Sequence, residues 1–279
     1  MWFFASDLHG NTTRYNKLFE AIRNEHPDVV LLGGDLLPHF GRFLDDDFLS
    51  GYFRIELHKL RDALKDEYPQ IYFIFGNDDL RSEEPTAEAL EKEQLWIHVH
   101  ARSVAINQFS LFGYAYVPPT PFRVKDWERY DVSRYVDPGC ISPEDGVHTT
   151  DVDEVETRYS TIQKDLEKLT QHQDLSKSVF LFHTPPYQTN LDRAALDGKK
   201  IDHAPLDVHV GSVAVRRFIE KQQPLLTLHG HIHESARMMG SWKDRIGKTQ
   251  MFSAAHDGAE LSLVRFDPED LNGATRELI

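Results

Sequence analysis

Side chains able to bind metal ions recur in this sequence directly after short apolar runs. They are Asp7 and His9 after WFFAS, Asp35 after VVLLGG, Asn77 after IYFIFG, His183 after SVFLF, and His231 with His233 after LLTLHG. Imidazole nitrogens combined with carboxylate and amide oxygens suit borderline divalent metals such as Mn, Fe, Zn, Co or Ni, whereas Ca²⁺ and Mg²⁺ sites consist mostly of oxygen. The residue types therefore predict a transition-metal centre.

Each of these residues stands at the carboxyl end of a predicted strand. Taken singly, each has a structural interpretation, because SDLHG and GGDL could be capping turns and a lone histidine is usually a hydrogen-bonded core residue. In open α/β sheets, however, the loops beyond the carboxyl ends of the strands form a common crevice. Convergence of residues from position 7 to position 233 there would make residues 1–279 a single domain.

The elements that would position these residues alternate between strand and helix. Near-continuous apolar runs over 2–5, 29–32 and 71–75 predict strands covered on both faces, as in an α/β protein. Apolar residues at helical spacing predict helices over 15–22 and 53–64. Further strands are predicted at LWIHV, FSLFGY, SVFLF, LLTLHG, TQMFSA and ELSLVRF.

Other segments carry weaker expectations. Apolar residues between 155 and 169 recur at spacings of four and three, which predicts one amphipathic helix. Residues 117–146, rich in proline, charge and aromatics, are expected to form an ordered insertion or lid beside the site. The acidic run Asp45–Asp47 is expected to begin a solvated helix, and the final dozen residues are expected to be frayed.

Composition restricts the partners of the chain. A formal net charge of -14 repels phosphate backbones and no basic patch is visible, so nucleic acid is not expected as a partner. The single cysteine, Cys140, excludes an intramolecular disulfide, fits a reducing compartment and is expected to be inert. The start MWFFASDLHG has no basic leader, and no apolar stretch approaches the roughly 20 residues that span a bilayer. We therefore expect a cytoplasmic protein without a membrane partner.

The ordered series DLH, GGD, GND, FHTPP and GHIH resembles the motifs of the calcineurin-like metallophosphoesterases. The stretch from HTPPYQTNLD to IGKT further resembles the Icc-related branch, which is similar to bacterial cyclic-nucleotide phosphodiesterases. The resemblance covers almost the whole chain and implies a metallophosphoesterase-type α/β sandwich of two mixed β-sheets flanked by helices. It implies two divalent metal ions, one bound by Asp7, His9, Asp35 and His233, and the other by Asp35 as a bridge with Asn77, His183 and His231.

The chemistry agrees with these implied roles. Two metal ions about 3.5 to 4 Å apart can acidify a bridging water and bind the phosphoryl oxygens during in-line attack. A ligand that bridges two cations should be negatively charged so that it stabilises both, and Asp35 is a carboxylate. Asn77 would contribute a neutral oxygen, which preserves the Lewis acidity of the ions.

Asp78 departs from the family pattern. In most relatives, a histidine follows the asparagine and meets the leaving oxygen of the substrate as an acid or hydrogen-bond donor. A carboxylate with an ordinary pKa near 4 cannot donate at neutral pH; nearby metal ions would lower that pKa, whereas burial or Asp79 would raise it. Asp78 could stay ionised and orient another group, which we favour; it could be held protonated; or His39 could fill the gap.

Three further residues are candidates for substrate contact: Asn11, His39 and His256. Asn11 stands where a helix is expected to begin, so capping is an alternative role, and His256 could likewise cap a turn. For His39 a plain structural role is the alternative. Arg14 and Arg123 could contact phosphate, although a free surface role is favoured for both.

The sequence thus predicts a dinuclear metal-dependent hydrolase of small phosphate esters. Without a histidine at position 78, phosphodiesters or esters with good leaving groups should be favoured over simple alkyl monoesters. The alternative is a scaffold that keeps the fold for protein interaction, as the resembling retromer subunit does, but such a scaffold has little reason to keep all the ligands. A nuclease is disfavoured by the acidic charge, and a protein phosphatase is conceivable.

Overall fold

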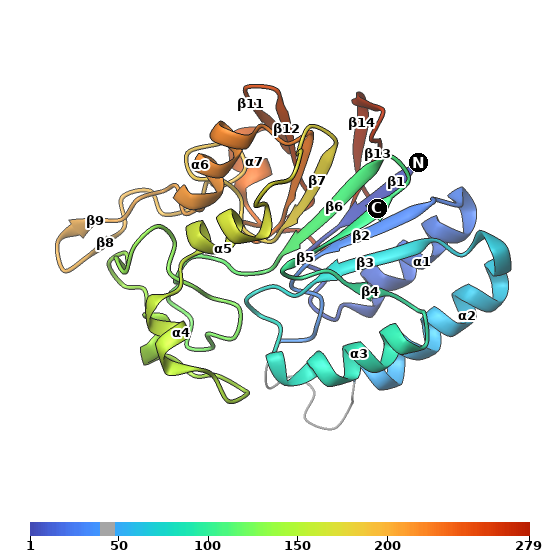
Figure 1. Ribbon diagram of the computed structural model, residues 1–279, viewed down its shortest axis with the longest axis horizontal. Coiled ribbons are helices and arrows are strands. Elements are labelled where there is room, and N and C mark those ends of the chain that lie inside the picture. The colour runs from blue at the N-terminus through green and yellow to red at the C-terminus, as the bar shows by residue number, and fades with distance from the viewer. Residues whose placement is uncertain (40–47) are drawn as a thin grey trace.

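Two six-stranded β-sheets pack face to face in the computed structural model, which describes residues 1–39 and 48–279 (Figure 1). The first sheet has the order β14 (Asp270–Leu278), β13 (Ser262–Asp267), β1 (Trp2–Ala5), β2 (Val29–Gly33), β3 (Gln70–Ile74) and β4 (Ile97–His98). The second has the order β11 (Lys243–Ile246), β12 (Thr249–Ser253), β10 (Leu226–His229), β7 (Ser178–Phe182), β6 (Phe109–Tyr114) and β5 (Arg102–Ile106). The predicted sandwich of two mixed sheets is confirmed.

The central strands of each sheet run parallel. In the first sheet β1, β2 and β3 are parallel neighbours, and in the second β6, β7, β10 and β12 are. Strands β1, β2, β7 and β10 are buried along their whole length, as expected for strands covered on both faces. Parallel neighbours bring their carboxyl ends to the same edge of a sheet.

Helices cover the outer faces of the sandwich (Figure 1). On the side of the first sheet lie α1 (Thr12–Glu25), α2 (Arg54–Leu64) and α3 (Glu84–Lys92). On the side of the second sheet lie α5 (Ile162–Leu169), α6 (Val213–Gln222) and α7 (Ser235–Met239). The first two helices confirm the prediction from apolar spacing, and α1 buries its apolar stripe of Tyr15, Leu18, Phe19 and Ile22. None of the helices among the described residues is long and apolar enough to cross a membrane.

The prediction of one continuous helix over 155–169 is wrong. The chain forms α4 (Glu154–Tyr159) and then α5, because Ser160 and Thr161 adopt extended backbone between them. The Thr161 hydroxyl accepts a hydrogen bond from the Lys164 amide at 3.2 Å and caps α5. Apolar residues of α4 face solvent, whereas those of α5 are buried. The apolar spacing over 155–169 therefore indicates a buried helix face only in its second half. The acidic run Asp45–Asp47 lies outside the described residues.

The expected fraying of the C-terminus is also wrong. Strand β14 pairs antiparallel with β13 and forms the edge of the first sheet. Two backbone hydrogen bonds between Leu261 and Ile279, 2.8 and 2.9 Å long, close the end of this pair. Strand β13 thus provides hydrogen-bond partners for the backbone of β14, which is ordered although few of its own side chains are apolar. Strand β5, which the sequence pattern did not predict, is likewise held by its pairing with β6.

Residues 117–146 form a long connection with a single short 3₁₀ turn at Pro143–Asp145. Lys125 and Glu128 form an ion pair inside this segment, and both side chains are fully buried. Asp131 accepts hydrogen bonds from the amides of Val213 and Ala214 at 2.7 and 3.1 Å, which fastens the segment to the start of α6. The small hairpin of β8 (Lys200–Ile201) and β9 (Ala204–Pro205) projects beyond it (Figure 1). Whether the segment acts as a lid remains a prediction.

Candidate metal centre

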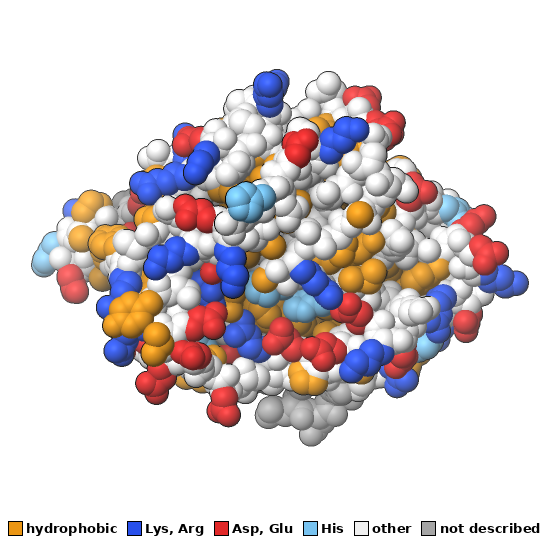
Figure 2. Space-filling model, viewed as in Figure 1, with side chains coloured by type: hydrophobic (Ala, Val, Ile, Leu, Met, Phe, Trp, Pro, Cys, Tyr) orange, Lys and Arg blue, Asp and Glu red, His pale blue; other side chains and the backbone are white. Residues whose placement is uncertain are grey.

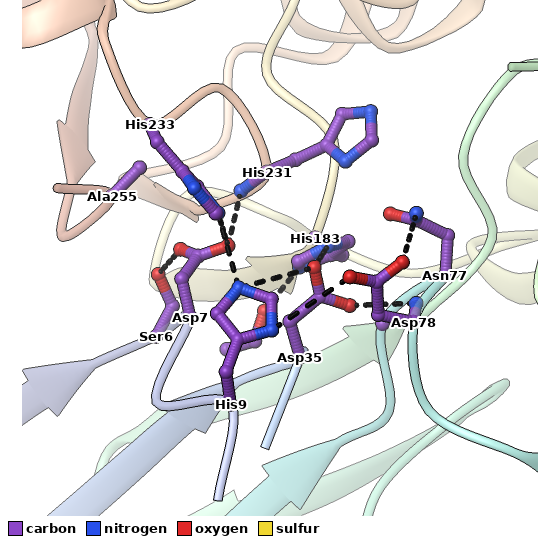
Figure 3. Close-up of polar contacts among 12 residues, drawn as sticks. Ser6, Asp7, His9, Asp35, Asn77, Asp78, His183, His231, His233 and Ala255 are labelled. Atoms are coloured by element: carbon purple, nitrogen blue, oxygen red, sulfur yellow. Dashed lines mark hydrogen bonds and ion pairs between the residues drawn. The ribbon is translucent and has the colours of Figure 1, made fainter. Parts of the chain in front are cut away.

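The side chains predicted to bind metal come together at one edge of the sandwich (Figure 3). They follow β1, β2 and β3 of the first sheet and β7 and β10 of the second. Figure 2 shows histidine side chains gathered in a hollow near the middle of this face, surrounded by acidic and basic groups. The convergence expected from the sequence is therefore present: Asp7, His9, Asp35, Asn77, His183, His231 and His233 lie around a common centre.

Unusual backbone holds these side chains in place. Four of the candidates have positive φ angles, namely Asp7 (56°), His9 (48°), Asp35 (53°) and His231 (72°). Such conformations cost energy in residues other than glycine, and they persist only where the surroundings enforce them. Here the amides of Asp7 and His9 donate to the carbonyls of Gly34 and Asp35 at 2.9 and 2.8 Å, which joins the two loops.

Glycine is required where the loops pass closest. A Cβ atom on Gly76 would lie 2.2 Å from Asp35 Oδ1 and 2.7 Å from His183 Nε2. A Cβ atom on Gly34, whose φ is +95°, would lie 2.6 Å from His183 Nδ1. The glycines in GGD and GND therefore make room for the ligand side chains.

The first group of ligand atoms comes from Asp7, His9, Asp35 and His233, and these atoms lie within 4.8 Å of one another. The Nε2 atoms of His9 and His233 are 3.2 Å apart, and His233 Nε2 is 3.2 Å from Asp7 Oδ1. His9 Nε2 is 3.9 Å from Asp35 Oδ2. Two imidazoles and two carboxylates directed at one point are a donor set that suits a transition metal.

The second group comes from Asp35, His183 and His231. The Nδ1 atom of His183 donates to the Gly33 carbonyl at 2.8 Å, which leaves its Nε2 facing Asp35 Oδ2 at 3.3 Å. Asp35 Oδ1 accepts from the Asp78 amide at 2.9 Å, so its Oδ2 is free for both groups. This position of Asp35 is the one that a bridging carboxylate requires.

Asn77 supplies an independent test of whether the residues fit a metal pair. Its side chain is 4% exposed, and within the described residues its Oδ1 atom accepts no hydrogen bond. The buried Nε2 of His183 makes no hydrogen bond with the described residues either, although it lies 3.3 Å from Asp35 Oδ2. A buried polar atom without a partner costs about 1–3 kcal/mol, and a bound cation would remove this cost. These atoms are the ones that the predicted second metal would contact.

The protonation of the site shows that it attracts positive charge. Burial opposes protonation of His183, but the charge of Asp35 prevails and raises its pKa to about 10. His233 is only partly buried; burial again opposes its protonation, but its hydrogen bond to Asp7 raises its pKa to about 9. Burial acts against ionisation of Asp7, yet the hydrogen bond and charge of His233 lower its pKa to about 2. Protons on these histidines thus occupy positions where metal ions would replace them.

Comparison with known proteins agrees with this geometry. The model of the family described as calcineurin-like phosphoesterase matches residues 3–235. The chain belongs to this family. The calcineurin-like metallophosphoesterase resemblance predicted from the motifs is therefore confirmed, and together with the Asp and His groups it supports a metal-dependent phosphoesterase.

Two solved structures share the fold of this phosphoesterase at low sequence identity. One crystal structure aligns with a TM-score of 0.57 and 14% identity, covering 100% of this chain and 97% of that chain. The crystal structure of TT1561 of Thermus thermophilus gives a TM-score of 0.55 and 15% identity, covering 99% and 97%. A novel archaeal phosphodiesterase gives 0.46 and 11%, covering 100% and 99%. No curated protein matches the chain.

Asp78 lies between two histidines of the phosphoesterase. Its Oδ2 is 3.0 Å from His39 Nδ1 and 3.7 Å from His9 Nδ1. The ring of His39 stacks on that of His9 with centroids 4.5 Å apart. Burial, followed by the charge of Asp35, raises the pKa of Asp78 to about 6. Asp78 is therefore largely ionised at pH 7 and can accept a hydrogen bond from His39.

Asp79 is a residue whose role sequence reasoning missed. Its side chain is fully buried, and its carboxylate accepts hydrogen bonds from three backbone amides: Gly76 at 2.8 Å, Leu36 at 2.9 Å and Leu37 at 2.7 Å. It therefore ties the loop that carries Asp35 to the loop that carries Asn77. The sequence signal that could have revealed this role is a second carboxylate close to the end of a buried strand. A carboxylate buried at such a position requires hydrogen-bond donors, and backbone amides are the donors that loops provide.

The remaining candidates have local partners. Asn11 Oδ1 caps α1 by accepting from the Thr13 amide at 3.0 Å, and His256 Nε2 lies 2.9 Å from a Glu260 carboxylate oxygen. The guanidinium of Arg14 donates to the Asp7 carbonyl at 2.6 Å and to the Gly258 carbonyl. A free surface role for Arg14 is therefore wrong, because these hydrogen bonds connect the loop of Asp7 to the loop of Gly258. Contact of Asn11 and His256 with substrate remains a prediction, and Arg123 is exposed.

Proposed function

We propose that this chain is a dinuclear metal-dependent hydrolase of small phosphate esters, with phosphodiesters and esters of acidic alcohols favoured. The observation that supports it best is the position of Asp35, whose free Oδ2 faces both groups of ligand atoms. Metal ions bound there would supply an acidified water and neutralise charge on the phosphoryl oxygens. The expected cytoplasmic location remains a prediction.

The residues of the chain have separate tasks in this proposal. Asp7, His9, Asp35 and His233 would hold one ion, and Asp35, Asn77, His183 and His231 would hold the other. Asp7 is itself oriented, because the His231 amide donates to its Oδ1 at 2.9 Å and the Ser6 hydroxyl donates to its Oδ2. The Gly33 carbonyl fixes the tautomer of His183 that leaves Nε2 available.

The preference for good leaving groups follows from the Asp78–His39 pair. An ionised Asp78 cannot donate a proton, and it instead orients His39 through the 3.0 Å contact. His39 is a candidate donor to the leaving oxygen, but its side chain is 45% exposed. A donor that is nearly half exposed to water is held less firmly than a buried one and is a weaker general acid, so poor leaving groups should react slowly.

Turnover by protein reconstituted with Mn²⁺, Fe²⁺, Zn²⁺, Co²⁺ or Ni²⁺ tests the proposal. The panel should contain bis-aryl diesters, cyclic nucleotides, aryl monoesters and alkyl monoesters. We expect aryl diesters to react fastest, and Asp78→His to raise activity on poor leaving groups selectively. His39→Gln should lower activity on poor leaving groups only, by about tenfold or more if His39 is the donor. Equal turnover of alkyl monoesters and bis-aryl diesters would contradict the preference.

The alternative function is a scaffold that does not hydrolyse esters, and the same experiment distinguishes it from an enzyme. It predicts that metal ions, if bound at all, bring no hydrolysis of any ester in the panel. The buried Asn77 Oδ1 without a hydrogen-bond donor among the described residues favours the enzyme, since a scaffold gains nothing from an unsatisfied polar atom. Salt-sensitive retention of the protein on DNA would instead revive a nuclease.

A further inference from the structure

A cavity of about 450 Å³ lies between β5, the end of β6 and α5. This volume is in the range of small-molecule binding sites. Side chains that line it include His100, Arg102, Tyr114, Tyr116, Asp165 and Lys168. None of these belongs to the metal centre.

The cavity and the metal centre lie on opposite faces of the second sheet. The Tyr114 hydroxyl donates to Asp165 on α5 at 2.7 Å, so Tyr114 points to the outer, helix-covered face. The ring of Phe182 contacts that of Tyr114, with centroids 6.4 Å apart, and lies on the same face. Because successive residues of a strand alternate, His183 points to the other face, where it meets Asp35.

The walls of the cavity are held in place before any ligand arrives. Arg129 donates to Asp165 at 2.7 Å and to Glu156 at 2.8 Å. Its guanidinium also lies 4.2 Å from the centre of the Tyr116 ring. The Tyr116 ring in turn contacts that of His100, with centroids 5.1 Å apart. Pre-formed walls of this kind reduce the entropy lost on binding.

One hydrogen-bond donor on the wall has no partner among the described residues. His100 Nδ1 accepts from the Ala115 amide at 3.0 Å, so the proton of the neutral ring is on Nε2. In the part of the chain that the structure describes, no acceptor meets this Nε2–H group. Burial, followed by the charges of His98 and Arg81, lowers the pKa of His100 well below its usual value, which keeps the ring neutral. A ligand acceptor would satisfy the free donor.

The cavity also carries a cation without an ion-pair partner in the described ranges. Arg102 is paired with Glu91 at 2.8 Å, and Arg129 is paired with Asp165 and Glu156. Lys168 makes no ion pair with any residue from 1–39 or 48–279. An exposed lysine that lines a cavity favours an anionic group on the ligand, because it is a local positive charge.

We propose that this cavity is a second binding site, separate from the metal centre, for a small planar aromatic ligand that carries a hydrogen-bond acceptor and an anionic group. The ring lies against the wall formed by His100, Tyr114 and Tyr116, its acceptor meets His100 Nε2–H, and its anion meets Lys168. Carboxylate and phosphonate groups share the required charge, and the test below distinguishes them.

Calorimetric titration of metal-loaded protein with quinoline-3-carboxylate and quinoline-3-phosphonate tests the site. The neutral quinoline-3-carboxamide serves as the control ligand. We expect Lys168→Glu to weaken binding of either anion by about tenfold or more, and the amide to bind about tenfold more weakly than the acids. Lys221→Glu, the same charge change at an exposed position on α6, should leave binding unchanged.

Two variants separate this site from the metal centre. Asp35→Asn should retain binding, because Asp35 belongs only to the metal groups, whereas His100→Phe should lose it without changing turnover of the best ester. Transfer of magnetisation from the ligand to the Tyr114 and Tyr116 rings should be visible in NMR spectra. Binding that Asp35→Asn abolishes and Lys168→Glu leaves intact would overturn the proposal, as would no binding of either anion at millimolar concentration.

Discussion

Two adjacent carboxylates at the end of β3 have different environments and different roles. Asp79 is fully buried and accepts hydrogen bonds from backbone amides of the two loops that it joins. Asp78 is partly exposed and faces His39 and His9. Asp79 therefore stabilises the fold, whereas Asp78 takes part in the proposed chemistry. The two aspartates differ in role because they differ in burial and in hydrogen-bond partners.

Removal of the Asp79 carboxylate should destabilise the protein. Asp79→Ala leaves three buried amides without an acceptor, so we expect a loss of about 2–4 kcal/mol in the free energy of unfolding measured in urea. Metal affinity should fall as well, since the loops of Asp35 and Asn77 lose their common tie. Asp78→Ala is the matched control and should change stability much less. Equal stability of both variants would show that Asp79 is not the tie.

At the level of helices and strands, side chains outside these elements fix how the segments meet. The N-terminus of α6 is satisfied by Asp131, which lies in the segment 117–146 rather than beside the helix in sequence. Ser212, the N-cap of α6, donates to the same carboxylate at 2.5 Å. A negative side chain at a helix start also interacts favourably with the helix dipole. This contact explains why a segment with little regular structure is nevertheless ordered.

Loss of this anchor should loosen one segment of the molecule selectively. In Asp131→Ala we expect faster hydrogen exchange and faster proteolysis within residues 117–146, with a fall of about 1–2 kcal/mol in global stability. Asn11→Ala removes the N-cap of α1 and serves as the control, because α1 covers the first sheet and the change should not affect 117–146. If both variants exchange like the wild type in that segment, the anchor is unimportant.

Across the molecule as a whole, the sandwich collects charge at one edge. The loops after β1, β2, β7 and β10 place two carboxylates and four imidazoles together, and the raised pKa values of His183 and His233 follow from this crowding. Protons and metal ions bound as proposed would therefore compete for the same positions. The raised pKa values of these histidines give the stability of the metal-free protein a characteristic dependence on pH.

The melting temperature of metal-free protein should fall as pH rises from about 6.5 to 10. The folded-state pKa values of His183 and His233 are about 10 and 9, above the usual 6.5, so their contribution is complete below 6.5 and is lost as these groups deprotonate. Metal ions replace the protons, so the increase in melting temperature caused by Mn²⁺ should grow with pH. Scanning calorimetry with EDTA or Mn²⁺ measures both curves.

His183→Gln controls for other groups that titrate in this range. Without His183, the metal-free melting temperature should decline less between pH 7 and 10, since one of the two raised pKa values is gone. A wild-type protein whose stability does not change over this range, or a metal effect that shrinks with pH, would contradict the predicted competition.

Local sequence was enough to predict the fold class, the buried strands and the residue types that gather at their ends. Continuous apolar runs report burial on both faces, and Asp7, Asp35 and His183 stand directly after such runs, so these features are local. Only the folded chain revealed that the helix breaks before Thr161, that β14 closes the first sheet, that Asp79 reaches Leu36 and that His39 lies beside Asp78. These depend on hydrogen bonds and contacts between segments distant in sequence. A local pattern of polarity cannot specify them, because the partner atoms come together only when the chain has folded.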